Sequence, residues 1–464
     1  MEDCPLTLLE YIESIRDRRI TVIGIGVSNL PLIRRLAAAG CRVTACDRRE
    51  RAALEAADEL ERLGVTLSLG DAYLDDIHAD IIFRTPGIRP DLPPILKAVE
   101  EGAVLTSEME AFFEVCPCRI VAVTGSDGKT TTTTLISELL KAAGKTVYLG
   151  GNIGHPLLCE ADEMDPEGFA VVELSSFQLM TMNGRSPDVA VVTNLAPNHL
   201  DVHKDMEEYT EAKANICRRQ EPGCVTVLNR DNDITAGFAS VTGGEIRWFS
   251  MKETQANGVF NREEMLISAE NGTESALMPV SDIRIPGRHN IENYMAAYAA
   301  VRDWVSPELL VHTAKTFNGV EHRIEFVREL RGVKYYNDSI ASSPSRTRAG
   351  LLSFRQKVIL IAGGKDKGVP FDSLGEDIIG HVKKLVVTGL TKDKIRAAVE
   401  GREEYRGQPP IFTVEDFREA VLKAAEIAES GDIVLLSPAC TSFDRFRNFE
   451  ERGRYFKQIV MGLE

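Results

Sequence analysis

One short stretch of the sequence, G-S-D-G-K-T at residues 125–130, combines the residue types that bind a nucleoside triphosphate. Its two glycines allow a tight turn that brings backbone N–H groups close to an anion. Lys129 would contact the β- and γ-phosphates, and the hydroxyl of Thr130 would reach Mg²⁺. We therefore predict an ATP-binding loop formed by Gly125, Ser126, Asp127, Gly128, Lys129, Thr130 and Thr131.

The residues around this loop predict the strand and the helix that must position it. Ile120–Val123 is an apolar run typical of a buried strand, and Leu135, Ile136, Leu139 and Leu140 have helical spacing. The longer pattern G-x-x-x-x-G-K-[ST] requires glycine at position 123, where this sequence has valine. A chance Gly-Lys-Thr in a surface loop is the alternative, but the agreement of strand, turn and helix signals favours the ATP loop.

Three further candidates follow the loop along the chain. Glu173 ends the apolar run Ala170–Val172, where a Mg²⁺ ligand would be expected after a phosphate loop, although a structural glutamate is the alternative. His199 comes shortly after a predicted strand at Val189–Val192. Lys213 lies on a predicted helix, Glu207–Arg218, and a lysine in such a motif is usually a solvated surface charge.

The N-terminal part of the chain predicts a lead-in helix within residues 1–18 and then a β-α-β unit. A strand at Ile20–Ile25 reaches two glycines, and the next strand, Arg42–Cys46, ends in Asp47. This spacing resembles a dinucleotide fingerprint, but Asn29 occupies the position of its third glycine. NAD(P), another nucleotide and no ligand at all remain open for this unit. For the turn Thr85–Ile88, after a strand at Ile81–Arg84, a ligand contact at the sheet edge and a turn with no role remain open.

Composition limits the class of protein. The 464 residues are too many for one ordinary core, and 44% hydrophobic with 27% charged residues is typical of a globular protein. A net charge of −16 without a long basic run argues against nucleic-acid binding. We find no signal-peptide pattern and no apolar run that could insert into a membrane. The nine scattered cysteines, with Cys116 and Cys118 as the close pair, indicate reduced thiols in a cytoplasmic protein.

The rest of the chain predicts further α/β structure. Residues 235–285 suggest short hairpins around Gly243-Gly244 and Asn271-Gly272. Beyond them, four predicted strands each lead into polar residues, which indicates another sheet with a binding edge; these strands are Val333–Tyr336, Val358–Ile361, Leu385–Thr388 and Ile433–Leu436. We expect an α/β protein with domains at 1–106, 107–318 and 319–464.

Taken together, these stretches resemble the Mur ligase family from end to end. The segments that carry the resemblance are G-I-G-V-S-N, T-P-G-I, T-G-S-D-G-K-T-T, G-G-N-I-G, E-L-S-S-F-Q-L, N-H-L-D, E-H-R, N-D-S and L-S-P-A-C-T-S-F-D-R-F-R-N-F-E-E-R-G. The last segment and E-L-S-S-F-Q-L are similar to the members that add D-glutamate. The resemblance implies a Rossmann-like uridine-nucleotide domain, a central P-loop ATPase-like domain and a C-terminal Rossmann-like domain.

The resemblance also implies an activity. Such an enzyme uses ATP and Mg²⁺ to join D-glutamate to UDP-N-acetylmuramoyl-L-alanine through an acyl phosphate, as a cytoplasmic monomer in peptidoglycan precursor synthesis. A sibling ligase with another acceptor, an NAD-dependent oxidoreductase and a nucleotide-binding regulator are the alternatives. The oxidoreductase leaves the ATP loop, Glu173 and His199 unexplained.

Site residues are implied for each ligand. The UDP contacts would be Val27, Ser28, Asp47, Arg48, Arg49 and Gly87, and the muramoyl and alanyl contacts Asn152, Gln178 and His199. Thr130 and Glu173 would hold one Mg²⁺, and His199 with N-carbamylated Lys213 a second. The implied catalytic residues are Lys129, His199 and Lys213.

The third domain would complete both remaining sites. Its Arg323 and Asp338 match residues that hold ATP, together with Asn290 of the central domain, whose R-H-N segment matches the adenine side. The D-glutamate contacts would be Ser342, Lys367, Ser442 and Phe449. Many relatives read D-S-K-A-T where this sequence reads D-S-I-A-S, so a cation is missing at Ile340. Either Lys367 or Arg346 would replace it, and we favour Lys367 because it follows two glycines at a strand end.

Overall fold

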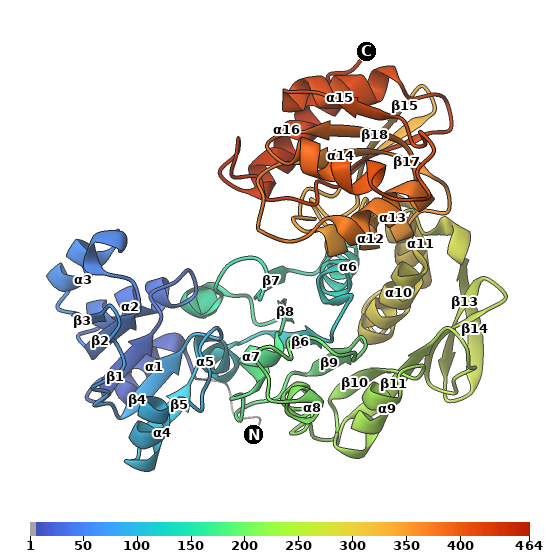
Figure 1. Ribbon diagram of the computed structural model, residues 1–464. Helices are drawn as coiled ribbons and strands as arrows, with labels where there is room; N and C mark the ends of the chain where they lie inside the picture. The colour runs from blue at the N-terminus through green and yellow to red at the C-terminus, as the bar shows by residue number, and fades with distance from the viewer. Residues whose placement is uncertain (1–5) are drawn as a thin grey trace. The chain divides into compact units, whose positions relative to one another are not determined.

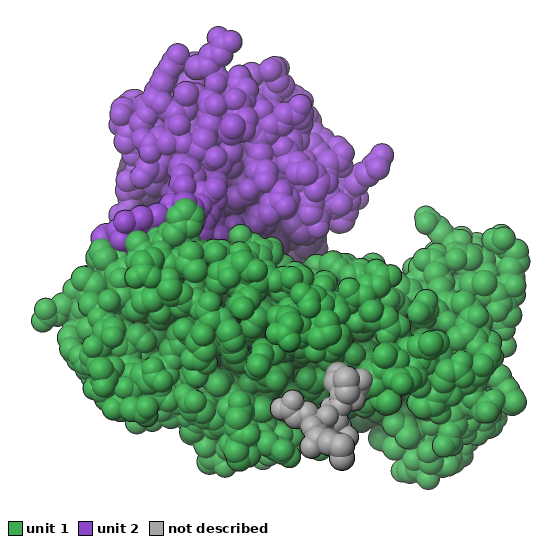
Figure 2. Space-filling view, turned by 180° about the vertical axis from the view of Figure 1, so that it is seen from behind, with its two compact units in different colours: residues 1–280, 292–313 green, residues 281–291, 314–464 purple. Residues whose placement is uncertain are grey.

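A computed structural model describes residues 6–464 and divides the chain into two compact units (Figures 1 and 2). Unit 1 comprises the chain up to residue 280 together with 292–313, and unit 2 comprises 281–291 and 314–464. Unit 1 contains two β-sheets and unit 2 contains one among the described residues. The expected domain boundaries after residues 106 and 318 stay a prediction.

The first sheet is wholly parallel, with strand order β3-β2-β1-β4-β5. Its strands are β1 Arg19–Ile23, β2 Arg42–Asp47, β3 Thr66–Leu69, β4 Ile81–Arg84 and β5 Val104–Thr106. The helices of this part are α1 Leu8–Ile15, α2 Asn29–Ala38, α3 Ala57–Arg62 and α4 Pro93–Glu100. Helix α1 confirms the amphipathic lead-in helix over its described part, with Thr7 as its N-cap; residues 1–5 lie outside the described residues. The β-α-β unit is confirmed as part of a Rossmann-like sheet.

Asn29 has a clear physical role where a dinucleotide fingerprint has glycine. Its buried side-chain amide donates to the carbonyl oxygens of Ile23, at 3.1 Å, and Gly24, at 3.0 Å. Gly24 has φ +91°, and a Cβ atom there would lie 2.6 Å from Thr85. The turn after β1 is therefore closed by an asparagine side chain, which adds a hydrogen bond to Ile23 O, already bonded to the Thr85 N–H at 3.0 Å, and satisfies Gly24 O.

The second sheet has strand order β14-β13-β12-β11-β10-β9-β6-β8-β7. Its strands are β6 Arg119–Thr124, β7 Val147–Gly151, β8 Phe169–Glu173, β9 Val189–Val192, β10 Val225–Asn229, β11 Glu245–Ser250, β12 Gly258–Arg262, β13 Met265–Glu270 and β14 Thr273–Pro279. The helices here are α5 Glu108–Val115, α6 Lys129–Ala142, α7 Ser176–Leu179, α8 Met206–Ala214, α9 Asp233–Gly237, α10 Arg288–Val301 and α11 Pro307–Thr316. The ATP loop joins β6 to α6, as the sequence predicts.

One predicted hairpin is wrong. Gly243-Gly244 precedes β11, which pairs in parallel with β10 and β12. The predicted hairpin at Asn271-Gly272 is confirmed, because it joins the antiparallel strands β13 and β14. A second antiparallel turn, at Glu263-Glu264, joins β12 to β13. A Gly-Gly pair predicts a turn but not its hairpin geometry, because pairing depends on where the sheet places each strand.

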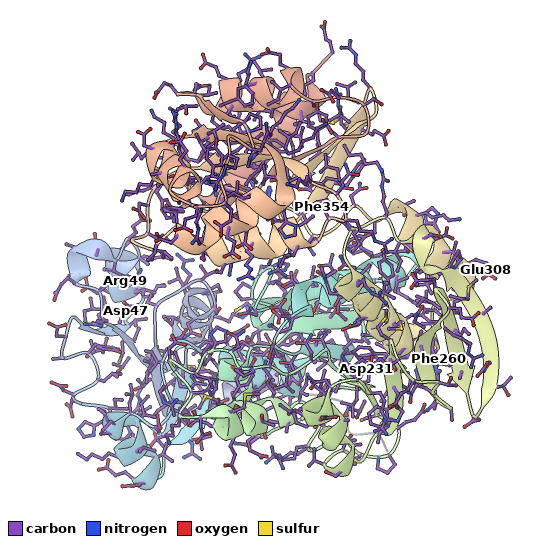
Figure 3. All side chains as sticks on the ribbon, turned by 45° about the vertical axis from the view of Figure 1, so that its right-hand side comes forward. Asp47, Arg49, Asp231, Phe260, Glu308 and Phe354 are labelled. Carbon is purple, nitrogen blue, oxygen red and sulfur yellow. The ribbon has the colours of Figure 1, made fainter. Side chains whose placement is uncertain are left out.

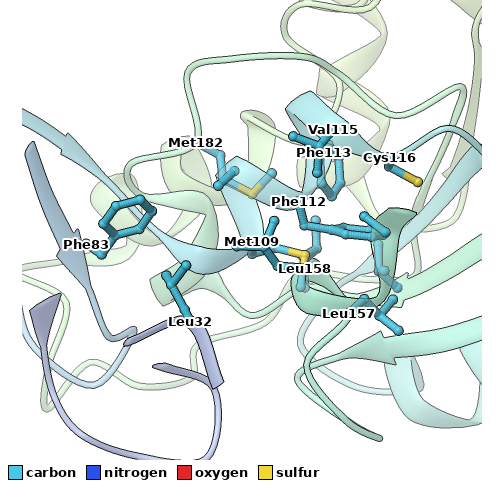
Figure 4. Packing of buried hydrophobic residues seen from close by; sticks show 14 of the residues in the cluster. Leu32, Phe83, Met109, Phe112, Phe113, Val115, Cys116, Leu157, Leu158 and Met182 are labelled. Carbon is cyan, nitrogen blue, oxygen red and sulfur yellow. The ribbon is translucent and has the colours of Figure 1, made fainter. Parts of the chain in front are cut away.

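A continuous apolar core runs through unit 1 (Figure 4). Leu32 of α2 and Phe83 of β4 belong to the first sheet's part of the chain. They share one cluster with Met109 and Phe112 of α5 and with Leu158, which lies between β7 and β8 of the second sheet. All five side chains are buried, and each contributes about 1.5–3 kcal/mol by burial. The two sheets of unit 1 therefore share one core.

The third sheet, in unit 2, has strand order β15-β16-β20-β17-β18-β19, with only β15 antiparallel among its described strands. Its strands are β15 Glu325–Leu330, β16 Val333–Asn337, β17 Val358–Gly363, β18 Val382–Thr388, β19 Ile411–Thr413 and β20 Ile433–Leu436. Its helices are α12 Pro344–Leu352, α13 Asp372–His381, α14 Lys392–Glu400, α15 Phe417–Glu426 and α16 Phe449–Met461. Separate apolar clusters cover its two faces, which confirms the expected Rossmann-like α/β domain. Within residues 6–464, no helix has the length and hydropathy to cross a membrane.

Candidate active site

The loop between β6 and α6 requires both of its glycines. Gly125 has φ +146°, and a Cβ atom there would lie 1.9 Å from Thr193 Oγ1. Gly128 has φ +80°, and its Cβ would lie 2.4 Å from Asn293 Oδ1. Both positions combine a backbone conformation that side chains disfavour with a neighbour that leaves no room. The backbone of the loop therefore packs directly against the side chains of Thr193 and Asn293, with no space for a Cβ atom.

Polar groups after β9 hold this loop in place. The Asp127 N–H donates to Asn194 Oδ1 at 2.9 Å, and Thr193 Oγ1 donates to the Asp127 carbonyl oxygen at 2.6 Å. The Ser126 hydroxyl lies 2.9 Å from Tyr209 Oη on α8. Thr193, Asn194 and Tyr209 were not predicted as supports. Thr193 and Asn194 belong to the polar stretch directly after a buried strand, which is a signal that could have identified them, whereas Tyr209 lies on α8.

Lys129 begins helix α6 and bends back onto the loop. Its Nζ atom donates to the carbonyl oxygens of Gly125, at 2.9 Å, and Ser126, at 2.8 Å. The first turn of α6 adds N–H groups and the positive end of the helix dipole, and it carries Thr130 and Thr131. Ammonium, N–H groups and dipole together form a cradle suited to phosphate.

Asn293 is a further support that was not predicted from the sequence. Thr132 Oγ1 lies 3.2 Å from Asn293 Oδ1, so α10 contacts the first turn of α6. Asn290, which was predicted, lies one turn earlier on α10 and belongs to unit 2. The spacing of three residues places the two amides on one helix face, which is the signal that could have identified Asn293.

Glu173 ends β8, directly beside the strand that leads into the loop. Its Oε1 atom accepts a hydrogen bond from Asn152 Nδ2 at 2.8 Å, whereas its Oε2 atom is buried with no hydrogen-bond partner among the described residues. A buried carboxylate oxygen without a partner is costly unless a ligand satisfies it. Two predicted residues, Glu173 and Asn152, are thus in direct contact, and the free oxygen fits a cation.

Lys213 is almost fully buried, with 1% of its surface exposed. Its Nζ atom donates to Thr124 Oγ1 at 3.0 Å and lies 5.1 Å from the centre of the Tyr209 ring. Burial lowers the Lys213 pKa well below its usual value, and the nearby charge of Lys129 lowers it further. The interpretation of the helix motif as a surface charge is therefore wrong, because α8 turns this lysine inward.

His199 lies in the loop after β9 with φ +56°. Its ring contacts the edge of Phe177, with ring centres 5.2 Å apart, and its pKa is lowered by partial burial and by Lys129. Phe177 stacks on His203, and His203 is held by Ser176 Oγ at 2.9 Å and Glu208 Oε2 at 3.2 Å. His199 is thus held by packing against Phe177, which His203 supports in turn. Its lowered pKa favours the neutral ring that a metal requires.

The carboxyl edge of the first sheet carries the predicted UDP contacts. Asp47 accepts hydrogen bonds from the Ile25 N–H at 2.8 Å and from two guanidinium nitrogens of Arg49, at 2.8 and 2.9 Å (Figure 3). Arg49 therefore lowers the Asp47 pKa to about 2. The others lie on the same edge: Val27 and Arg48 are exposed, Ser28 precedes α2, and Gly87 lies on the turn after β4.

A cavity lies between the first sheet's edge and the second sheet. Its lining includes Ser28, Arg84, Glu108, Gly151 and Gln178. The Oε1 atom of Gln178 closes a capping box by accepting from Ser175 N and Oγ, at 2.9 and 2.8 Å. Its amide nitrogen is the atom that remains for a ligand. The structure therefore brings Ser28 and Gln178 to one cavity.

Within unit 2, Asp338 follows β16 and is buried. It accepts from Ser437 Oγ at 2.7 Å and from the Ile324 N–H at 3.3 Å, and burial raises its pKa to about 7. Arg323 is close enough to favour the charged form of Asp338. The joint use of Asn290, Arg323 and Asp338 with the loop of unit 1 stays a prediction.

The predicted acceptor residues meet at the carboxyl edge of the third sheet. Lys367 Nζ lies 3.2 Å from Ser342 Oγ, and the loop of Lys367 pairs with that of Ser442 through Lys365 and Thr441. The carbonyl oxygen of Phe449, at the start of α16, accepts from Ser339 Oγ at 2.8 Å. Arg346 donates instead to the carbonyl oxygen of Ile340, at 3.3 Å.

Arg452 is a buried cation beneath this edge that the sequence analysis missed. Its guanidinium donates to Ser339 Oγ at 3.0 Å, to the Ser339 carbonyl at 2.9 Å and to the Cys440 carbonyl at 3.1 Å. Its remaining terminal nitrogen is buried without a partner among the described residues. Arg452 therefore fixes two of the loops that carry the predicted contacts.

Comparison with protein families gives three matches that follow one another along the chain. Residues 18–107 match the Mur ligase MurD-like N-terminal domain, 123–301 the Mur ligase middle domain, and 322–440 the Mur ligase glutamate ligase domain. Curated relatives match over nearly the full length. The UDP-N-acetylmuramoylalanine--D-glutamate ligase of Acetivibrio thermocellus is 51% identical over 98% of this chain and 99% of its own, and that of Clostridium novyi is 49% identical over the same shares.

Solved structures share the fold at low sequence identity. A UDP-N-acetylmuramoyl-L-alanyl-D-glutamate--2,6-diaminopimelate ligase has a TM-score of 0.58 and 19% identity over 97% of this chain and 94% of its own. The UDP-N-acetylmuramate-alanine ligase of Thermotoga maritima has a TM-score of 0.54 and 19% identity over 96% of this chain and 99% of its own. These likenesses establish the three-domain architecture.

Proposed function

Because the chain belongs to the Mur ligase family, we propose that it is the ATP-dependent ligase that joins D-glutamate to UDP-N-acetylmuramoyl-L-alanine, with ADP and phosphate as the other products. The observation that carries this proposal is the 51% identity, over nearly the full length of both chains, to the UDP-N-acetylmuramoylalanine--D-glutamate ligase of Acetivibrio thermocellus. The phosphate cradle at Gly125–Thr130 supports the use of ATP. Peptidoglycan precursor synthesis in the cytoplasm, by a monomer, is part of the same proposal.

The reaction has two steps, neither of which requires a covalent bond to the protein. First, a carboxylate oxygen of the L-alanyl group attacks the γ-phosphorus of ATP, which forms an acyl phosphate and releases ADP. The amine of D-glutamate then attacks the acyl carbon, and phosphate leaves from the tetrahedral intermediate as the nitrogen loses a proton. The protein must align anions that repel each other, so positioning and fixed positive charge supply most of the catalysis.

Lys129 and the N–H groups of the loop supply that charge on the phosphate side. The loop is held by Thr193 and Asn194, and Asn293 contacts Thr132 in the helix that follows it, so the loop is already ordered where charge develops. Asn152 and Gln178 orient the muramoyl and alanyl parts, and the edge that carries Val27, Ser28, Asp47, Arg48, Arg49 and Gly87 binds the uridine diphosphate.

The residues around Glu173 fit Mg²⁺. The unpartnered Oε2 atom of Glu173 and the hydroxyl of Thr130 are oxygen donors of the kind this ion prefers. Magnesium would neutralise phosphate charge when bound. His199 would contribute a neutral imidazole to a second ion, which needs further oxygen donors because imidazole is a weak magnesium ligand.

Lys213 would supply such oxygens as a carbamate. The neutral amine adds to carbon dioxide and releases one proton, which replaces an ammonium by an anionic oxygen donor. The burial of Lys213 without an ion pair among the described residues supports this modification, because a buried amine is more easily neutral. Lys129, His199 and Lys213 would then be the residues closest to the transferred phosphoryl group.

Unit 2 would supply the remaining ATP contacts and the D-glutamate pocket. Arg323, Asp338 and Asn290 would hold ATP from the other domain, which requires domain closure. Lys367 would bind the side-chain carboxylate of D-glutamate, with Ser342, Ser442 and Phe449 around it. Arg452 holds Ser339 and Cys440 and thereby orders this pocket.

The first test is phosphate release from ATP with Mg²⁺ and UDP-N-acetylmuramoyl-L-alanine. D-glutamate, L-glutamate and L-alanine are compared as acceptors at equal concentration. We expect release with D-glutamate alone. Turnover with another amino acid would keep the ligase and reject the acceptor pocket, whereas ATP binding without turnover would favour a nucleotide-binding regulator.

A further inference from the structure

One buried arginine joins the two sheets of unit 1. Arg84 ends β4, and only 1% of its surface is exposed. Its terminal nitrogens donate to Thr85 O at 3.2 Å, to Pro86 O at 3.3 Å and to the Ile88 carbonyl oxygen. The same guanidinium donates to the Phe177 carbonyl oxygen of helix α7 at 2.7 Å and to Thr181 Oγ1, just after this helix, at 3.2 Å.

This arrangement is unusual for a charged group. No carboxylate within residues 6–464 forms an ion pair with Arg84, and its Nε atom is buried without a partner. Burial lowers its pKa to about 10. An unpaired buried charge costs stability, so a leucine or methionine would be the better choice if Arg84 only filled the core.

The positions of its partners suggest what Arg84 does. The carbonyls of Pro86 and Ile88 flank Gly87, the predicted uridine contact on the turn. The carbonyl of Phe177 directly precedes Gln178, the predicted muramoyl contact on α7. One rigid, planar group therefore holds the neighbours of two residues that would bind opposite ends of one substrate, and Arg84 itself lines the cavity between them.

A second link acts on the same segment. Arg89 follows the turn and donates to Glu208 Oε1 on α8 at 2.8 Å and to Asp91 at 2.8 Å. The turn Thr85–Ile88 is thus tied to the second sheet's helices on both of its sides. This link is partly exposed, so it would be weaker than the buried one.

We propose that Arg84 is a positioning residue for the UDP-linked substrate, which sets the separation between the uridine contacts on the first sheet and Gln178 on α7. This inference rests on the proposed function for the identity of the substrate. A guanidinium that fixes this separation should strengthen the binding of a ligand that spans both subsites. It should have little effect on the affinity for a ligand that occupies only one of them.

Calorimetric titration of UDP and of intact UDP-N-acetylmuramoyl-L-alanine separates these cases, because binding is measured without turnover. Arg84→Met is compared with wild type and with Arg19→Met, which removes an exposed arginine paired with Asp80 in the same sheet. We expect Arg84→Met to weaken the binding of the intact substrate at least tenfold and the binding of UDP less than threefold. Arg19→Met should change neither, and the KM values for ATP and D-glutamate should change less than twofold in both variants.

Two results would overturn the inference. An equal loss for UDP and intact substrate would mean that Arg84 serves the uridine subsite alone, and no loss for either would mean that it has no role in binding. Arg84→Lys, which keeps the charge but cannot reach the turn and α7 together, gives the same test if Arg84→Met does not fold. Wild-type protein that binds the intact substrate but forms no ADP with D-glutamate would reject the proposed function and leave this comparison valid.

Discussion

The Nζ atom of Lys213 lies 3.0 Å from Thr124 Oγ1, at the end of the strand that leads into the phosphate loop. The amine is buried, and within residues 6–464 it forms no ion pair. A lysine held in this way beside a second cation, Lys129, loses much of its tendency to be protonated. This geometry makes a covalent change at Lys213 testable.

Lys213→Ala should reduce ADP formation by about 100-fold or more, because a misplaced phosphoryl group alone costs about that much. Formate or acetate should restore part of the activity by placing a carboxylate where the carbamate would lie. Lys141→Ala, which removes an exposed lysine of α6, is the matched control. Phosphate release with and without the added acid gives the readout. A Lys213→Ala protein with unchanged activity would reject the carbamate.

Gly125→Ala should destabilise unit 1 and abolish ATP binding. The positive φ alone costs about 1–3 kcal/mol for a residue with a side chain, and the new Cβ would collide with Thr193 Oγ1. Gly237→Ala is the control, because Gly237 ends helix α9 with open space around a Cβ; it should be neutral or stabilise by up to about 1 kcal/mol. Thermal unfolding and nucleotide titration report the two effects. Normal ATP affinity in Gly125→Ala would contradict the assigned loop.

Lys367→Ala should raise the KM for D-glutamate by about tenfold or more, the usual effect of losing a charge-assisted hydrogen bond. The KM for ATP should change far less. Lys394→Ala removes a neighbouring lysine that pairs with Asp366, and it should affect both values little. Steady-state phosphate release provides all of these constants. Small, equal changes in both KM values for Lys367→Ala would count against the predicted pocket.

Glu108 predicts a pH dependence of stability. Burial raises its pKa from 4.5 to about 7, so the folded protein holds a proton that the unfolded chain releases. Stability therefore falls as pH rises from about 4.5 to 7 and levels off above that, by about 3 kcal/mol in total. Glu108→Gln keeps an oxygen for the Leu158 N–H without the charge.

Unfolding temperatures of wild type and Glu108→Gln at pH 5 and pH 8 test this assignment. The variant should gain stability relative to wild type at pH 8 and gain little at pH 5. Glu100→Gln, at an exposed position of α4, should show no such difference. A gain that is equal at both values of pH would mean that Glu108 keeps an ordinary pKa in the folded protein.

Much of the fold follows from local patterns. Apolar runs such as Ile120–Val123 and Val189–Val192 identified buried strands, because strands covered on both faces need side chains of that kind. The glycine-bearing turn between β6 and α6 was predictable because strand, turn and helix signals depend on adjacent residues. The pairing around Gly243-Gly244 was not, since strand order is a property of the whole sheet.

The supports of the site escaped prediction for a related reason. Thr193 and Asn194 contact a loop more than 60 residues away, and Arg84 reaches α7 across 93 residues. A threonine or an arginine in isolation is as common on a surface as in a site. Only contacts across the fold distinguish the two.

The sequence by itself determined the α/β class, the phosphate loop and the polar residues at the ends of strands, because strand, turn and helix signals depend on neighbours along the chain. The tertiary structure alone decided which of these groups are buried and what they touch. Lys213 looks like any helix lysine in the sequence, and Glu173 like any strand-end acid. The lowered pKa of Lys213 and the unpartnered Oε2 atom of Glu173 arise from burial, which depends on how distant segments pack together.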